Sequence, residues 1–313
     1  MENKDRTNKD QSDGRAIIFG GLGAPARWIL LALPAVAALA FLTILFWPAS
    51  KDTPAVLRVG VLPDQSPEAL QQRFQPLLDY LSTEVGIPFQ LVVPGDYAAL
   101  LGMFHNREVD VAYFGGLTFL KARATDGALA LVMRDVDTRF RSSFLVRADR
   151  PEASIGEFRG KTLAFGPRLS TSGHLMPRYF LRQEHIEPEY WFTNIIYSAA
   201  HDATALLVRD GKADLGVANA EIVEAMFRDG RLRRDEVRVV DQTPPYADYV
   251  WAMRNGIDAT LYDRVLLAFL RLSPTDAKDS AILKKMGAGG FLPVLESDMK
   301  SLRQIAASME LLG

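Results

Sequence analysis

The chain has 313 residues, of which 48% are hydrophobic, and a formal net charge of −2 at pH 7. This composition is typical of a globular protein and excludes a disordered, fibrous or multi-span chain. The balanced charge argues against nucleic acid as a partner, since no excess of Lys and Arg is present to release counterions from phosphates. Cysteine is absent, which excludes disulfides, thiolate metal sites and a cysteine nucleophile.

The N-terminal region predicts attachment to a membrane. Residues 1–27 are polar, whereas residues 29–47 carry no charge. These nineteen residues would span about 28 Å as a helix, close to the hydrocarbon thickness of a bilayer. Because Lys and Arg precede the apolar run, we predict a cytoplasmic tail over 1–28, a transmembrane anchor over 29–47 and a linker over 48–55. A cleaved signal sequence is the alternative, although the run is longer than such a sequence requires.

Beyond the linker, a strand pattern is followed by a helix with clear boundaries. Val56–Leu62 alternates apolar and polar residues and predicts a strand. Ser66 stands at an N-cap position, Pro67 suits the first helical position, and Gly86 ends the helix. Pro76 lies inside this helix and predicts a kink or a break, because proline has no backbone N–H to donate.

Strand and helix patterns alternate through the following residues. The predicted strands are Phe89–Val93, Val109–Phe114, Ala128–Met133, Ser143–Val146, Lys161–Phe165, Asn194–Tyr197 and Ala213–Val217. The predicted helices are Tyr97–His105, Leu117–Ala124 and three that begin at Ser172, His201 and Ala220. This alternation predicts βαβ units, largely parallel sheets and two α/β lobes, with a ligand in the cleft between the lobes.

The segment 165–173, FGPRLSTSG, has the composition of an anion-binding turn. A strand leads through hydroxyl-bearing residues directly into a helix, whose first N–H groups have no partner inside the helix. Ser170, Thr171 and Ser172 add three hydroxyls to these amides, and Gly173 lets the backbone approach closely. Such a group of donors favours a phosphate-like anion. Ordinary N-capping is the alternative, but a cap needs only one hydroxyl.

Motifs outside this turn extend the pattern over residues 56–310. They are Phe74-x-Pro76-Leu77-x-x-Tyr80-Leu81, Asp96-Tyr97, Val109–Gly115, His201 followed by Asp202-Ala203-Thr204-Ala205, and Asp214 with Asn219 and Glu221. Together with the STSG turn, these motifs resemble the periplasmic phosphonate-binding family, the soluble receptors of importers for phosphonate, phosphite and related oxyanions. The resemblance implies a type II periplasmic-binding-protein fold over 56–313, with two α/β lobes and a hinge. Lobe one would comprise 56–145 and 250–313, and lobe two 148–246.

The same resemblance implies a set of ligand-binding residues. Members of the family hold the phosphonyl oxygens with the STSG turn, a histidine and tyrosines at the cleft edge. The matching residues in this chain are Ser170, Thr171, Ser172, Gly173, His201, Tyr97 and Tyr113. Acids that match Glu221 and Asp248 hold the ammonium group in aminophosphonate receptors. Phe114 and Phe140 stand where tyrosine is usual, so the ligand need not be an aminophosphonate.

These features predict the substrate-binding component of an ABC importer for phosphonate, phosphite or phosphate, with the permease as its partner. The domain would lie on the periplasmic side of the cytoplasmic membrane as a monomer, without catalytic activity or a cofactor. No metal is expected, because four scattered His and no Cys offer no ligand spacing. The alternatives are an anchored sensory ectodomain that reports oxyanion occupancy to a signalling partner, and a hydrolase with Ser170 as nucleophile and His201 as base.

The two acids also suggest a rule of selectivity. An ionised carboxylate only accepts hydrogen bonds. If Asp248 or Glu221 faces the anion, that acid tolerates only a ligand oxygen that still carries a proton. Monoprotonated phosphonate, phosphite or phosphate would then be accepted, and sulfate or selenate refused.

Overall fold

The computed structural model describes residues 53–312, which lie in one compact unit of the chain, Lys51–Gly313. The predicted anchor at 29–47 therefore lies outside the described residues. Within 53–312, every helix is too short or too polar to cross a bilayer.

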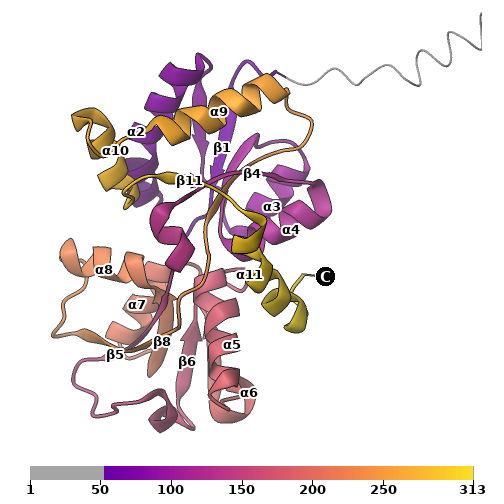
Figure 1. Ribbon diagram of the computed structural model, residues 1–313. Coiled ribbons are helices and arrows are strands. Elements are labelled where there is room, and N and C mark those ends of the chain that lie inside the picture. The colour runs from indigo at the N-terminus through magenta and orange to yellow at the C-terminus, as the bar shows by residue number, and fades with distance from the viewer. Residues whose placement is uncertain (1–52, 313) are drawn as a thin grey trace, which may run out of the picture. The chain divides into compact units, whose positions relative to one another are not determined.

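A six-stranded sheet, in the order β11-β4-β10-β3-β1-β2, forms the core of what we call lobe one (Figure 1). Its strands are β1 (Leu57–Val61), β2 (Phe89–Val92), β3 (Val111–Phe114), β4 (Leu129–Arg134), β10 (Val250–Met253) and β11 (Phe291–Pro293). Its helices are α2 (Pro67–Val85), α3 (Tyr97–His105), α4 (Gly116–Asp126), α9 (Ala259–Arg271), α10 (Ala277–Met286) and α11 (Glu296–Ser308).

A five-stranded sheet, in the order β7-β6-β8-β5-β9, forms the core of lobe two. Its strands are β5 (Ser142–Arg147), β6 (Thr162–Phe165), β7 (Asn194–Tyr197), β8 (Leu215–Asn219) and β9 (Val237–Gln242). Its helices are α5 (Met176–Gln183), α6 (Pro188–Trp191), α7 (His201–Arg209) and α8 (Ala220–Arg228). Residues 142–145, which the sequence analysis assigned to lobe one, pair inside this second sheet.

The expectation of largely parallel sheets is wrong, because the first strand after each crossing between the lobes is antiparallel to its neighbours. The pairs of β1 with β2 and β3, and of β6 with β7 and β8, are parallel as expected. β5 and β10 are each antiparallel to both of their neighbours. The chain crosses to β5 through 135–141 and returns to β10 through 243–249, so each of these strands runs against the sheet that it joins (Figure 1).

The crossing segments are bonded to each other. The amide of Phe140 donates to the carbonyl oxygen of Tyr246 at 2.8 Å, and the amide of Tyr246 donates back at 3.0 Å. A paired connection of this kind holds the two lobes together while leaving few residues to absorb a hinge rotation. The strand ends that flank it supply several side chains of the candidate site.

Helix α2 keeps its predicted ends but not its predicted break. The hydroxyl of Ser66 accepts the amide of Ala69 at 3.3 Å, and Gly86 adopts the left-handed conformation with φ 69°. Pro76 lies inside an uninterrupted helix. It removes a single backbone bond, whereas one face of the helix is buried over its whole length through Leu70, Phe74, Leu77, Leu78, Leu81 and Val85. Tertiary packing therefore outweighs the local effect of the proline.

Two glycines allow the end of β6 to touch the turn that precedes α5. A Cβ on Gly173 would lie 2.8 Å from Cα of Gly166 and 2.9 Å from Cε1 of His201. The amide of Gly166 donates to the carbonyl oxygen of Gly173 at 2.8 Å, which fixes the contact. Since one neighbour is backbone and the other a buried ring, neither can move away from an added methyl group cheaply.

We therefore expect Gly173→Ala to lower the free energy of unfolding by about 1–3 kcal/mol, the usual effect of overpacking a tight contact. Gly102→Ala is the matched control, because Gly102 lies in helix α3 with nothing within 4 Å of its added Cβ. There the free energy of unfolding should stay constant or rise by up to about 1 kcal/mol. Urea unfolding of the domain measures both changes, and equal stability of the two variants would contradict this account.

Candidate functional site

Nine polar side chains from both lobes meet between the sheets, and we call them the polar cluster. Each is at most 4% exposed. Lobe one and the crossing segments supply Asp64, Tyr97, Asp248 and Tyr249, and lobe two supplies Ser170, Thr171, Ser172, His201 and Asn219. The cluster follows the carboxyl ends of β1, β6 and β8, the edge at which ligands bind in α/β sheets.

The three hydroxyls of the STSG turn have three different roles. The hydroxyl of Ser170 accepts the amide of Gly173 at 2.9 Å, which is an ordinary N-cap. The hydroxyl of Thr171 accepts the amide of Leu117 from lobe one at 2.9 Å, so it links the lobes. The buried hydroxyl of Ser172 has no hydrogen-bond partner among the described residues. N-capping therefore accounts for one hydroxyl only.

The backbone at this turn differs from a simple helix start. Thr171–Leu175 forms a π-helical turn, and the α-helix α5 begins only at Met176. π-Helical turns widen the hydrogen-bonding ring and are frequent at functional sites. A negatively charged group is favoured beside the start of a helix, because the first amides have no partner inside it.

His201 is a neutral hydrogen-bond donor. Its Nδ1 accepts the amide of Asn219 at 3.2 Å, so Nε2 carries the hydrogen and faces the hydroxyl of Ser170 at 3.3 Å. Burial lowers the pKa of His201 to about 3, so the ring stays uncharged at neutral pH. This is the wrong tautomer for a base that would take the proton of Ser170, since Nε2 has no free lone pair.

Two buried carboxyl groups lie in the cluster, Asp64 and Asp248, of which only Asp248 was predicted from the sequence. Burial raises the pKa of Asp248 to about 6, against the opposing effect of hydrogen bonds from the amides of Gly116 and Tyr249. Burial also raises the pKa of Asp64. One oxygen of Asp64 accepts the phenol of Tyr249 at 2.8 Å, and the other has no partner among the described residues.

A chain of hydrogen bonds ties these acids to lobe two. The side-chain amide of Asn219 donates to the phenol oxygen of Tyr249 at 3.0 Å, and that phenol donates to Asp64. The backbone amide of His201 donates to the carbonyl oxygen of Asp64 at 3.1 Å. Asp64 could have been suspected from its place after β1, at the ligand-binding edge of the sheet. Nothing local to Tyr249 marked it, because its partners are distant in the sequence.

The two predicted tyrosines differ in their surroundings. Burial, and then the charge of Asp64, raise the pKa of Tyr97 well above its ordinary value, so its phenol remains a donor. That hydroxyl has no hydrogen-bond partner among the described residues. The phenol of Tyr113 also lacks a partner among the described residues, but Tyr113 lies in the core of lobe one, where its ring stacks on Tyr249 with 5.0 Å between centroids.

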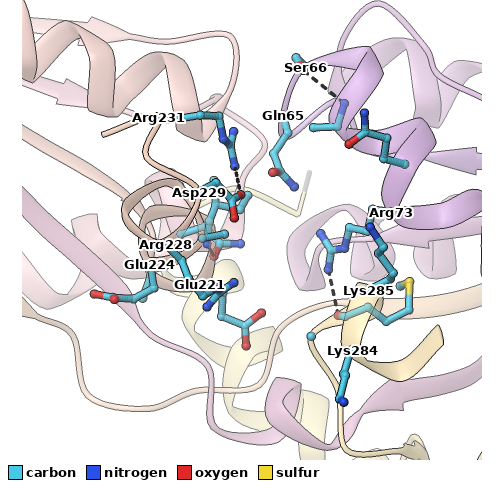
Figure 2. Close-up of a pocket in the computed structure, with 18 of the residues that line it drawn as sticks. Gln65, Ser66, Arg73, Glu221, Glu224, Arg228, Asp229, Arg231, Lys284 and Lys285 are labelled. Carbon is cyan, nitrogen blue, oxygen red and sulfur yellow. Dashed lines mark hydrogen bonds and ion pairs between the residues drawn. The ribbon is translucent and has the colours of Figure 1, made fainter. Parts of the chain in front are cut away.

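Glu221 lies apart from the polar cluster. Its carboxylate is 2.9 Å from Nη1 of Arg134, and its side chain is 37% exposed. It lines a surface cavity of about 740 Å³ between α2, α8 and α10 (Figure 2). The structure thus brings together the predicted residues Ser170, Thr171, Ser172, Gly173, His201, Tyr97 and Asp248, but not Glu221.

The tautomer of His201 leads to a spectroscopic prediction. Burial lowers the pKa of His174 to about 4 as well, but Nδ1 of His174 donates to the carbonyl oxygen of Arg168 at 2.7 Å. Nitrogen-15 NMR of the imidazole groups should therefore show two rings that remain neutral from pH 8 down to pH 5, of which only His201 carries its hydrogen on Nε2. An unperturbed histidine, with a pKa of about 6.5, becomes mostly protonated over this range. His201→Gln should remove the neutral signal with hydrogen on Nε2 and so assign it. Protonation of His201 above pH 5 would contradict the assignment.

The comparisons with known proteins identify the family of this chain. A family model described as ABC transporter, phosphonate, periplasmic substrate-binding protein matches residues 59–299. A probable ABC transporter phosphite binding protein from Prochlorococcus marinus is 29% identical over 270 residues, which cover 82% of this chain and 91% of that protein. The phosphonates-binding periplasmic protein of Escherichia coli is 25% identical over 293 residues, which cover 89% and 86%.

A solved structure shows the same similarity in three dimensions. PhnD1 of Prochlorococcus marinus, in complex with methylphosphonate, superposes with a TM-score of 0.78 at 28% identity. The superposition covers 83% of this chain and 100% of that one.

Proposed function

We propose that the polar cluster binds a small tetrahedral oxyanion of the phosphonate, phosphite or phosphate type. The basis is that this chain belongs to the family of periplasmic substrate-binding proteins of phosphonate ABC transporters. As a member of that family the chain is the substrate-binding component of an ABC transporter and is extracytoplasmic. The observation that carries the proposal is the pair of buried donors without a partner, the hydroxyls of Ser172 and Tyr97.

Neutral donors account for the affinity of this site. His201 is uncharged, and the hydroxyls and helix amides offer hydrogens without a formal positive charge. A buried donor that lacks a partner costs about 1–3 kcal/mol, and an anion that accepts its hydrogen recovers this cost. Closing the lobes over the ligand removes water and strengthens each of these bonds.

Asp248 sets the selectivity in this proposal. It is 1% exposed, and hydrogen bonds from the amides of Gly116 and Tyr249 hold it beside the STSG turn. An ionised Asp248 requires a ligand oxygen that brings its own proton, as monoprotonated phosphite or methylphosphonate does. Sulfate has no such proton at neutral pH and meets an unpaired carboxylate. Glu221 has no part in this rule, since Arg134 already neutralises it.

Titration calorimetry with phosphite, methylphosphonate, phosphate and sulfate tests the proposal. Near pH 7.5 we expect the wild type to bind at least one of the first three and to refuse sulfate. Asp248→Asn should weaken that binding by about 10- to 100-fold, because a hydrogen bond to a charged group contributes about 1.5–3 kcal/mol and 1.4 kcal/mol is tenfold. The same variant should gain measurable affinity for sulfate, since its amide can donate.

The raised pKa of Asp248 also gives this selectivity a pH dependence. Below about pH 6 the acid becomes protonated and can donate to an anion without protons. The discrimination of the wild type against sulfate should therefore fall between pH 7.5 and pH 5, and Asp248→Asn should show no such change. Asp241→Asn, at an exposed position of lobe two, is the control and should match the wild type. Sulfate binding as tight as methylphosphonate binding at pH 7.5 would overturn the rule.

The proposal also includes how the binding domain is held at the membrane. An uncleaved anchor over 29–47 would keep the binding domain at the outer face of the cytoplasmic membrane, as a monomer beside its permease. The intact mass of the protein from its native host should then include residues 1–50, and carbonate washing should leave it in the membrane fraction. Release in soluble form, with a mass that begins near residue 48 or later, would show a cleaved signal sequence instead.

A further inference from the structure

An ion pair crosses from lobe one to lobe two outside the polar cluster. Nη1 of Arg134, the last residue of β4, lies 2.9 Å from the carboxylate of Glu221 in the first turn of α8. The arginine side chain is 1% exposed and the glutamate side chain 37%. One partner is thus fixed inside lobe one, and the other is carried by the opposite lobe.

The guanidinium of Arg134 is held in place without help from lobe two. Its Nε and Nη2 donate to the two oxygens of Asp137 at 2.9 and 2.5 Å, and Nη1 donates to the carbonyl oxygen of Met286 at 2.7 Å. A guanidinium with a bidentate partner is pre-organised, so little side-chain entropy is lost when a second carboxylate joins it. Arg134 therefore presents a ready site to Glu221.

The same pair is connected to the polar cluster. The guanidinium carbon of Arg134 lies 5.8 Å from the ring centroid of Tyr249, whose phenol bonds Asp64 and Asn219. Asn219 is also the N-cap of α8, since its side chain accepts the amide of Ile222 at 3.0 Å. Asn219, which bonds the phenol of Tyr249 in the cluster, therefore also begins α8, the helix that carries Glu221.

Charges around the cavity favour approach of the two lobes. Lobe one lines it with Arg73, Lys284 and Lys285 in addition to Arg134, and with the single acid Glu68. Lobe two lines it with the acids Glu221, Glu224 and Asp229 and with Arg228 and Arg231. Figure 2 shows Glu221 and Glu224 on one side of the cavity and Arg73, Lys284 and Lys285 on the other. Attraction between these sides is strongest where the distance is shortest, at Arg134 and Glu221.

We propose that Arg134 and Glu221 form a latch that stabilises the lobes in contact and thereby sets the affinity for the anion without touching it. The inference rests on the proposed function, because it requires an anion held between the lobes. If only the closed arrangement binds tightly, the apparent Kd equals the intrinsic Kd divided by the closed fraction. Loss of the latch lowers that fraction and weakens every ligand by the same factor. Glu221 is a positioning residue in this scheme.

Glu221→Gln and its matched control Glu224→Gln test the latch. Both residues lie on α8, but Glu224 pairs with Arg234 of lobe two itself, at 2.7 Å. Titration calorimetry should show the Kd of Glu221→Gln raised by about 3- to 20-fold for each anion that the wild type binds, the range expected for loss of a partly exposed ion pair. Glu224→Gln removes the same charge from the cavity but no ion pair between the lobes, so its Kd should stay closer to that of the wild type. Raising the salt concentration should reduce the difference in Kd between Glu221→Gln and the wild type, because salt screens the ion pair.

A direct measurement of closure separates a latch from a ligand contact. Small-angle X-ray scattering at rising anion concentration should show that Glu221→Gln reaches the same compact form as the wild type, but at higher concentration. The ligand panel should include 2-aminoethylphosphonate, because a direct contact of Glu221 with an ammonium group would weaken that ligand alone and would overturn the latch. Equal Kd values for Glu221→Gln and wild type would also overturn it. A wild type that binds none of the anions would refute the proposed function, and the latch with it.

Discussion

Pairing of buried donors is the constraint on which the arrangement of this molecule depends. A hydroxyl or amide that is removed from water must find an acceptor or raise the free energy of the fold. Two hydroxyls of the STSG turn have protein partners, since Ser170 accepts the amide of Gly173 and Thr171 accepts the amide of Leu117 from the other lobe. Ser172 and Tyr97 are left as donors without a protein partner. In the proposed function, a tetrahedral anion accepts a hydrogen from each of these two donors.

The topology explains why the donors come from both lobes. The chain crosses between the lobes just before β5 and again just before β10, and the two crossing segments are bonded to each other. Strand ends, helix starts and both crossing segments therefore converge there. The return segment supplies more polar side chains to the cluster than the outgoing one, namely Asp248 and Tyr249. Phe140, on the outgoing segment, packs its ring against Tyr249 with 5.5 Å between centroids and adds no polar group.

The proposed determinants of selectivity and of affinity lie in different places. Asp248 lies inside the cluster, where we propose that its protonation state selects the anion oxygen. Arg134 and Glu221 lie at the cavity outside the cluster, where we propose that their attraction favours the closed lobes. A change in the first alters the ranking of ligands, whereas a change in the second alters all affinities together. Such a division lets the affinity be tuned without loss of discrimination.

Local chemistry in the sequence determined the ends of α2 and α3, the donor-rich turn at 170–173 and the family resemblance, because caps, glycines and hydroxyls act within a few residues. Only the tertiary structure decided the direction of β5 and β10, the unbroken helix at Pro76, and the roles of Asp64 and Glu221. Asp64 bonds a phenol 185 positions away, and Glu221 meets an arginine on another lobe. Such partners are chosen by how the lobes pack, and packing energy is not encoded in any short stretch of chain.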